Sequence, residues 1–101
     1  MPEDPPKGIR TVVIDAGHGG RDPGAVGKRG MEKDIALAIA LKVGNYIQKN
    51  IPDVKVIYTR KNDVFVELHE RARIANDAEA DLFVSIHVNA IHKPEIHGTL
   101  T

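Results

Sequence analysis

The sequence has neither cysteine nor tryptophan, and only 4% of its 101 residues are aromatic. Without cysteine, a disulfide framework and a thiolate metal site are both excluded, so any metal ion must be held by His, Asp or Glu. The scarcity of aromatic rings disfavours a sugar-binding module built on stacked aromatic side chains. No apolar run approaches the roughly 20 residues that a membrane-spanning helix needs, so we expect no membrane span.

An excess of charge of one sign is also missing, because 14 Lys and Arg balance 14 Asp and Glu. This balance gives no electrostatic reason to expect a nucleic-acid or membrane-surface partner. Residues 1–8 are rich in proline and lack the apolar core of a signal peptide. We therefore predict a linker or disordered segment over residues 1–10 and a single domain over residues 11–101.

Short apolar segments are present, and they alternate between strand and helix character. The strand–helix–strand–helix–strand order predicts an α/β domain of three layers, with a mostly parallel central sheet flanked by helices and incomplete at the C-terminus. We predict strands at residues 11–15, 54–59 and 81–88, helices at 32–50 and 68–80, and the start of a fourth strand at 98–101.

Six glycines and Pro23 fill residues 17–30, which predicts an irregular loop. Each helix carries one apolar stripe that we expect to face the sheet. The stripe of the first helix comprises Ile35, Ile39, Val43 and Tyr46 or Ile47, and that of the second comprises Leu68, Ala72, Ala75 and Ala78.

Three residues of metal-ligating type lie where the chain should reach one edge of the sheet. His18 follows the first strand, Glu32 begins the first helix and His87 lies at the end of the third strand. In a common doubly wound order the first and third strands are neighbours, and ligand sites form outside the carboxyl ends of the strands. Two imidazoles and one carboxylate would match a His₂Glu zinc site with a fourth position for water.

Side-chain alternation supports this site, because Ser85, His87 and Asn89 share one face of the third strand and a polar face needs partners. Simpler explanations also exist. A histidine in a glycine-rich loop is commonly held by loop hydrogen bonds, and Glu32 is a favourable charge at a helix N-terminus. The residues alone leave both explanations open.

Several motifs resemble those of the zinc-dependent N-acetylmuramoyl-L-alanine amidases. The first reads IDAGHGGRDPGA over residues 14–25, and the last reads SIHVNA over residues 85–90. The resemblance runs from residue 11 to about residue 90, and it identifies the chain as the N-terminal part of a catalytic domain of that family. Between the two motifs, in the family's order, come Met31-Glu32-Lys33-Asp34, Thr59-Arg60 with Asp63, Leu68 with Arg71, and Ala75-Asn76.

The resemblance implies that His18, Glu32 and His87 bind Zn²⁺. It also implies hydrolysis of the amide between N-acetylmuramic acid and L-alanine in peptidoglycan. An enzyme of this kind is a cell-wall amidase or autolysin that acts in cell separation, in the periplasm or outside the cell. A protein activator and self-association through an exposed sheet edge are left open as further interactions.

The general base of this family is a glutamate near the end of the domain, which we expect beyond Thr101. The glutamates that follow the first helix do not match its motif; they are Glu67, Glu70, Glu79 and Glu95. We therefore expect the chain to bind zinc but to be a poor amidase alone.

Other polar residues have two explanations each. Asp15 could accept a hydrogen bond from a liganding histidine or cap the glycine loop, and Asn89 could orient substrate or close its own loop. Arg60 is expected to pair with Asp63, with a role in substrate binding as the alternative. Asp22 most simply forms a turn with Pro23 and Gly24.

The other histidines are not expected to bind the metal. His69-Glu70 resembles half of the HExxH zinc motif, but Arg73 stands where the second histidine would be, so the motif fails. His92 and His97 lie in a polar loop and are expected to be solvated.

Two rival functions remain. A dinucleotide-binding fold would place glycines after the first strand, but the spacing is not GxGxxG and the helix begins too late to receive a pyrophosphate. A non-catalytic zinc- or peptidoglycan-binding module would keep the ligands without the general base.

Overall fold

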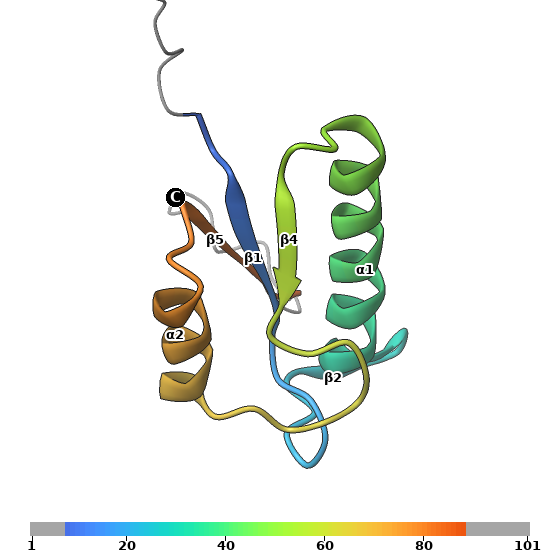
Figure 1. Cartoon of the computed structure of the whole chain (residues 1–101). Coiled ribbons are helices and arrows are strands. Elements are labelled where there is room, and N and C mark those ends of the chain that lie inside the picture. The colour runs from blue at the N-terminus through green and yellow to red at the C-terminus, as the bar shows by residue number, and fades with distance from the viewer. Residues whose placement is uncertain (1–7, 89–101) are drawn as a thin grey trace, which may run out of the picture.

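The computed structural model describes residues 8–88, and these residues form an α/β structure. The main sheet has three strands and lies between the two helices (Figure 1). The strands of the main sheet are β1 (Thr11–Ala16), β4 (Lys55–Tyr58) and β5 (Leu82–Ile86), the helices are α1 (Glu32–Asn50) and α2 (Leu68–Asp77), and a small hairpin comprises β2 (Val26–Gly27) and β3 (Gly30–Met31).

The main sheet is parallel, and β1 lies at its centre in the order β4-β1-β5. Val12 pairs with Val56 on one side and with Leu82 on the other. The prediction that the first and third strands are neighbours is confirmed, since β1 pairs directly with β5 over five residues. All three carboxyl ends therefore meet at one edge of the sheet.

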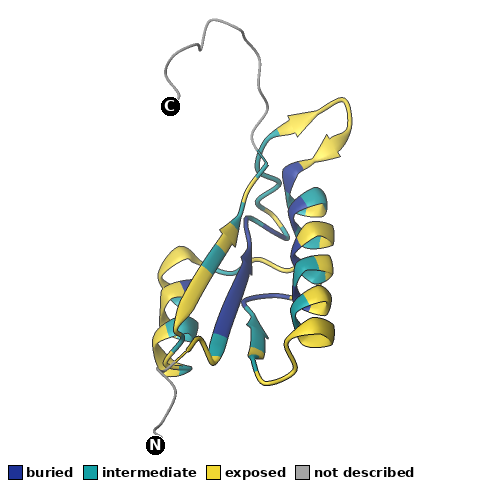
Figure 2. Cartoon of the chain, turned by 90° about the horizontal axis from the view of Figure 1, so that it is seen from above, coloured by how far each residue is buried: buried dark blue, intermediate teal, exposed yellow. Residues whose placement is uncertain are grey.

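The two helices cover opposite faces of the sheet, which gives three layers (Figures 1 and 2). The side chains of β1 alternate between these layers. Val12, Ile14 and Ala16 are buried with Ala40 of α1 in the apolar core. The intervening Asp15 faces the other layer, where it bonds to Arg71 of α2. The predicted three-layer arrangement is confirmed.

Small residues form the centre of the buried face of α1. The predicted stripe is correct at Val43 and Ile47, which pack against the core, and wrong at Ile39 and Tyr46. Ala36, Ala40 and Gly44 are the apolar residues buried in this helix, whereas Tyr46 is 68% exposed and Ile39 is also exposed. The reason is close approach, because a Cβ atom at Gly44 would overlap the hydroxyl of Tyr58 on β4. Larger residues flank the small ones and fill the sides of this contact; they are Leu37, Val43 and Ile47.

The face of α2 that meets the sheet is centred on Arg71, the buried residue of this helix. The predicted stripe is wrong at Leu68, which is 81% exposed, and at Ala72, which is also exposed. The helix ends at Asp77 rather than at residue 80, because Glu79 adopts a left-handed φ of 54° and the Ala80 N–H bonds to the Ala75 carbonyl.

The segment 17–30, predicted to be irregular throughout, ends in the hairpin of β2 and β3 (Figure 2). Val26 pairs with Met31 and Gly27 with Gly30, so Lys28 and Arg29 form the turn. The hairpin delivers the chain to the first residue of α1.

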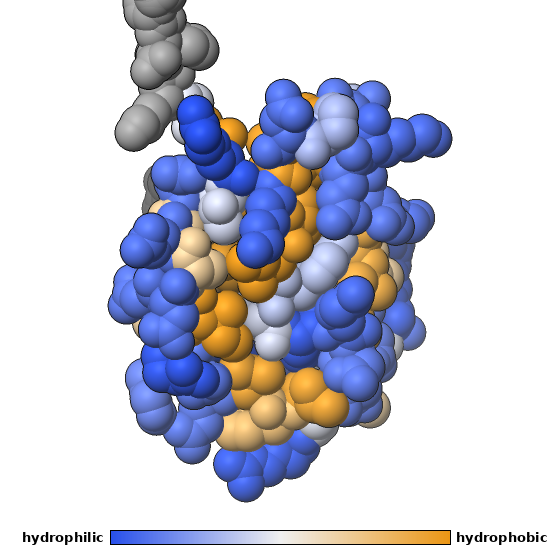
Figure 3. Space-filling model, in the orientation of Figure 1, coloured by the Kyte–Doolittle hydropathy of each residue, from blue (hydrophilic) through white to orange (hydrophobic). Residues whose placement is uncertain are grey.

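Figure 3 shows the apolar side chains gathered in a band between the two helices, with hydrophilic side chains on either flank. Neither of the helices in residues 8–88 has the length and apolar character needed to cross a membrane.

Candidate metal centre

His18, Glu32 and His87 meet at the carboxyl edge of the sheet. Glu32 Oε2 lies 3.1 Å from His18 Nε2 and 3.1 Å from His87 Nδ1. The two imidazole rings are 5.0 Å apart and nearly perpendicular. One ligand atom from each residue lies within 4.8 Å of the others, so three positions distant in sequence converge as the strand order predicted.

The donor set fits a zinc ion. Four ligands around tetrahedral zinc, each about 2.0–2.1 Å from the metal, are about 3.4 Å from one another. The 3.1 Å separations between the carboxylate oxygen and the two ring nitrogens are close to that spacing. Three protein ligands also leave a fourth position for water or substrate, which is the arrangement of hydrolytic zinc sites.

Backbone hydrogen bonds hold the Glu32 carboxylate in place. It is 3% exposed, and its carboxylate accepts hydrogen bonds from the backbone N–H groups of Ala25 (2.9 Å) and Val88 (3.0 Å). Burial raises the pKa of Glu32, but these two hydrogen bonds and the nearby histidines more than offset it, so the pKa lies below its ordinary value. The carboxylate is therefore ionised at neutral pH, as a metal ligand must be.

His18 is oriented by Asp22. His18 Nδ1 lies 2.8 Å from Asp22 Oδ2, and this contact leaves Nε2 to face Glu32. The hydrogen bond to His18 and the backbone bond from Gly24 lower the pKa of Asp22. The turn predicted for Asp22 is present in the bond from Gly24 N–H, but its contact with His18 was not predicted.

Two glycines make room for the ligands. A Cβ atom at Gly17 would lie 2.5 Å from the His87 ring, and one at Gly24 would lie 2.6 Å from the His18 ring. Gly24 also has a left-handed φ of 69°, which favours glycine. Larger residues at these two positions would overlap the histidine rings, so this loop requires glycine there.

Asp15 contacts neither histidine, and neither role proposed for it from the sequence describes its surroundings. Its carboxylate accepts hydrogen bonds from Arg71 (2.6 Å), Thr59 (2.7 Å) and Ser85 (2.7 Å). Burial raises the pKa of Asp15. The three hydrogen bonds and the charge of Arg71 lower it by more, so the pKa lies below its ordinary value. Asp15 therefore ties α2 and the ends of β4 and β5 to β1.

Arg71 also fixes the loop that carries His18. Its guanidinium donates to the backbone carbonyls of Ala16 (2.7 Å), His18 (2.8 Å) and Val66 (2.9 Å). His18 has a φ of 64°, a left-handed conformation that costs a non-glycine residue about 1–3 kcal/mol. The bond from Arg71 to the His18 carbonyl helps to hold the residue in this conformation.

The predicted pair of Arg60 and Asp63 is wrong. Arg60 is buried and donates to the carbonyls of Ala16 and Gly17. Asp63 instead accepts from Lys33 Nζ and from the Gly20 N–H, because the turn after β4 brings it beside the glycine loop. Both residues therefore stabilise the loop around the ligands.

The remaining predicted residues lie away from the centre or outside the described residues. His69, whose HExxH half-motif fails at Arg73, is exposed beside Glu67. Within residues 8–88, His18, Glu32 and His87 are the metal-ligating group that the structure brings together. Asn89, His92, Glu95, His97 and the predicted strand at 98–101 lie outside the described range.

Comparison with known proteins places these features in one family. The family model for N-acetylmuramoyl-L-alanine amidase matches residues 12–101. An endolysin of Bacillus phage SPP1 is 52% identical over 81 residues, and the amidase AmiA of Escherichia coli is 42% identical over 92 residues. These matches cover 80% and 90% of the chain but only 30% and 31% of the two relatives.

Solved structures of amidases also resemble this chain. The catalytic domain of the amidase CwlV from Bacillus (Paenibacillus) polymyxa superposes with a TM-score of 0.78 and 45% identity, over 84% of this chain and 48% of that one. The CwlD amidase of Clostridioides difficile, solved in complex with the GerS lipoprotein, gives a TM-score of 0.70 and 37% identity over 83% of this chain and 50% of that one. The chain belongs to the N-acetylmuramoyl-L-alanine amidase family and spans about half of these solved chains.

Proposed function

We propose that residues 11–101 are the N-terminal part of a zinc-dependent amidase domain, and that residues 1–10 are a linker. The whole domain hydrolyses the amide between N-acetylmuramic acid and L-alanine in bacterial peptidoglycan. The convergence of His18, Glu32 and His87 carries this proposal, because it forms a His₂Glu ligand set in a chain of this family.

Three residues of the chain would hold the zinc ion, and others would orient them. His18 through Nε2, Glu32 through its carboxylate and His87 through Nδ1 would hold Zn²⁺. A zinc ion with an open position polarises a carbonyl and lowers the pKa of bound water. Asp22 keeps His18 in the required tautomer, and the backbone bonds to Glu32 keep its carboxylate aimed at the two histidines.

The general base is proposed to lie beyond Thr101. Among residues 8–88 the glutamates of α2 and its ends do not join the metal-ligating group. Glu70 pairs with Arg73, and Glu67 lies beside His69. Residues 11–101 would thus supply the metal centre and part of the substrate groove.

The proposed site of action is the bacterial cell envelope, periplasmic or extracellular, with a role in cell separation as an autolysin. A protein activator is proposed by analogy with the relative solved together with a lipoprotein. Self-association is proposed at the outer edge of β5, which pairs only with β1 among the described strands and exposes Leu82 and Phe83.

A non-catalytic zinc- or peptidoglycan-binding module is the second candidate for this stretch of chain. It would keep the ligand set of His18, Glu32 and His87 and act without a general base. The rival dinucleotide-binding function is not proposed, since the family match and the ligand cluster have no counterpart in it.

Metal analysis of the purified chain tests the proposal. The wild type should bind about one zinc ion per chain, and His87→Ala should weaken binding by at least tenfold, because two ligands hold zinc far less tightly than three. The matched control is His69→Ala, which removes an exposed histidine outside the cluster and should leave the zinc content unchanged. Equal zinc content in all three proteins would contradict the proposed centre.

A further inference from the structure

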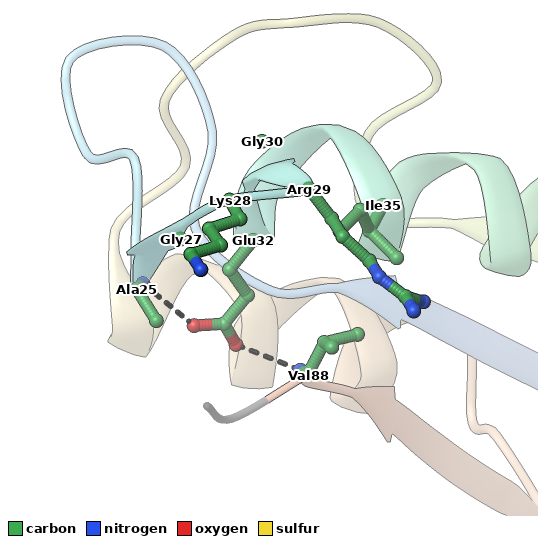
Figure 4. A pocket seen from close by; sticks show the side chains of 8 residues that line it. All are labelled: Ala25, Gly27, Lys28, Arg29, Gly30, Glu32, Ile35 and Val88. Atoms are coloured by element: carbon green, nitrogen blue, oxygen red, sulfur yellow. Dashed lines mark hydrogen bonds between the residues drawn. The ribbon is translucent and has the colours of Figure 1, made fainter. Parts of the chain in front are cut away.

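A hollow lies beside the metal centre, on the side of Glu32 (Figure 4). It encloses about 570 Å³ when its open mouth is counted. Its apolar wall consists of Ala25, Ile35 and Val88, and its charged residues are Glu32, Lys28 and Arg29. A molecule bound in this hollow would lie next to Glu32, which is a proposed metal ligand.

The two cations of this hollow have no acidic partner within residues 8–88. Lys28 and Arg29 are exposed in the turn of the hairpin, and no carboxylate of the described part forms an ion pair with either. Lys33, by contrast, pairs with Asp63. In the close-up, Arg29 extends beside Ile35, and Lys28 points back toward Gly27 (Figure 4).

A second hollow lies on the side of His18 and His87, and its charged side chains pair with one another. His18 and His87 line it together with Phe65, Leu68, Asp22 and Arg71. Arg71 pairs with Asp15, and Asp22 pairs with His18. Among the described residues this hollow therefore offers apolar surface but no free cation, so the two sides of the centre differ in charge.

The proposed substrate differs in charge on its two sides as well. Its lactyl carboxyl group is consumed in the amide bond, and the acetylated sugar is uncharged. Negative charge therefore lies on the peptide side, at the C-terminus and at acidic side chains. We propose that the hollow beside the hairpin binds the peptide part of the substrate, with Lys28 and Arg29 contacting its carboxylates, an inference that rests on the proposed function.

The experiment compares two ligands on the zinc-loaded chain. N-acetylmuramoyl-L-alanyl-glutamate and its analogue with both carboxylates amidated are titrated by calorimetry against the wild type and K28Q/R29Q. The wild type should bind the free acid more tightly than the amide, by about three- to tenfold, since each exposed ion pair contributes little. K28Q/R29Q should bind both ligands equally, at the affinity of the amide.

The matched control is K42Q/K49Q, which removes two exposed positive charges of α1 outside the hollow. It should keep the preference for the free acid. The inference is overturned if the wild type shows no preference, if neither ligand binds, or if the control loses the preference equally. Zinc content, measured on the same samples, is independent of these results, so a chain that fails to hold zinc reports the failure of the proposed function instead.

Discussion

Asp15 and Arg71 form a buried ion pair, and each side chain makes further hydrogen bonds. Both side chains are buried, and both also bond to other groups that surround the ligand loop. A buried ion pair is not in itself a large source of stability, because each charge loses its water. Removing one partner alone is costly, since the other charge is then left buried without compensation.

Asp15→Asn should therefore destabilise the fold at pH 7 by about 3 kcal/mol. The pKa of Asp15 is lowered in the folded state, so its stabilising contribution is present above its unfolded-state pKa of about 3.9 and is lost as pH falls through the folded value. The difference between wild type and variant should shrink below about pH 3.9. Urea unfolding of both proteins at several pH values measures this difference.

The control for this prediction is Asp53→Asn, a change at an exposed residue. Its unfolding free energy should stay close to that of the wild type at pH 7. A destabilisation by Asp15→Asn that is the same at pH 7 and at pH 2.5, roughly a pH unit below the unfolded pKa, would show that the ionised carboxylate is not what stabilises this contact.

The convergence of His18, Glu32 and His87 could be predicted from the sequence because all three lie where the chain reaches the carboxyl edge of the sheet. The residues that orient these three could not. Arg71 lies 56 positions from Asp15, and no local pattern links two residues at that separation. For Asp22 a signal existed, since it lies four residues after His18 and could reach back to it, but its place before Pro23 and Gly24 was fully explained by a turn.

At the scale of elements, α1 packs through its smallest residues. Hydrophobic periodicity identifies the larger apolar residues of a helix. For α1, those residues lie at the sides of its contact with the sheet and not at the centre. The actual centre is set by Ala40 and Gly44, which let the helix approach β1 and Tyr58. The existence of both helices and all three main strands was predictable, whereas the rotation of each helix depended on contacts distant in sequence.

Gly44→Ala should destabilise the protein by about 1–3 kcal/mol, because the added methyl group meets the Tyr58 ring. Helix propensity alone would predict the opposite sign, a gain of about 1 kcal/mol. The sign of the change in unfolding free energy, from denaturant titration, decides between packing and propensity. Gly27→Ala is the control, since nothing lies within 4 Å of its new Cβ atom, and it should change stability little.

At the scale of the whole molecule, the parallel sheet brings three segments to one edge, and within residues 8–88 two hollows adjoin the centre. The Glu32 side carries the hairpin cations, and the His18 and His87 side carries apolar surface. This polarity follows from the α/β layers, because the first crossover supplies Glu32 and the hairpin, whereas the second supplies Phe65 and Leu68.

A chain that covers about half of its solved relatives should bind zinc without efficient turnover. General acid–base catalysis typically contributes 10²–10⁴-fold to a rate. With the general base beyond Thr101, as proposed above, the chain should release peptide from purified peptidoglycan at least about 100-fold more slowly than the CwlV catalytic domain. Quantifying the free amino groups released over time measures both rates, and His87→Ala supplies the background. Turnover comparable to the relative, and abolished by His87→Ala, would mean that residues 1–101 themselves provide the base.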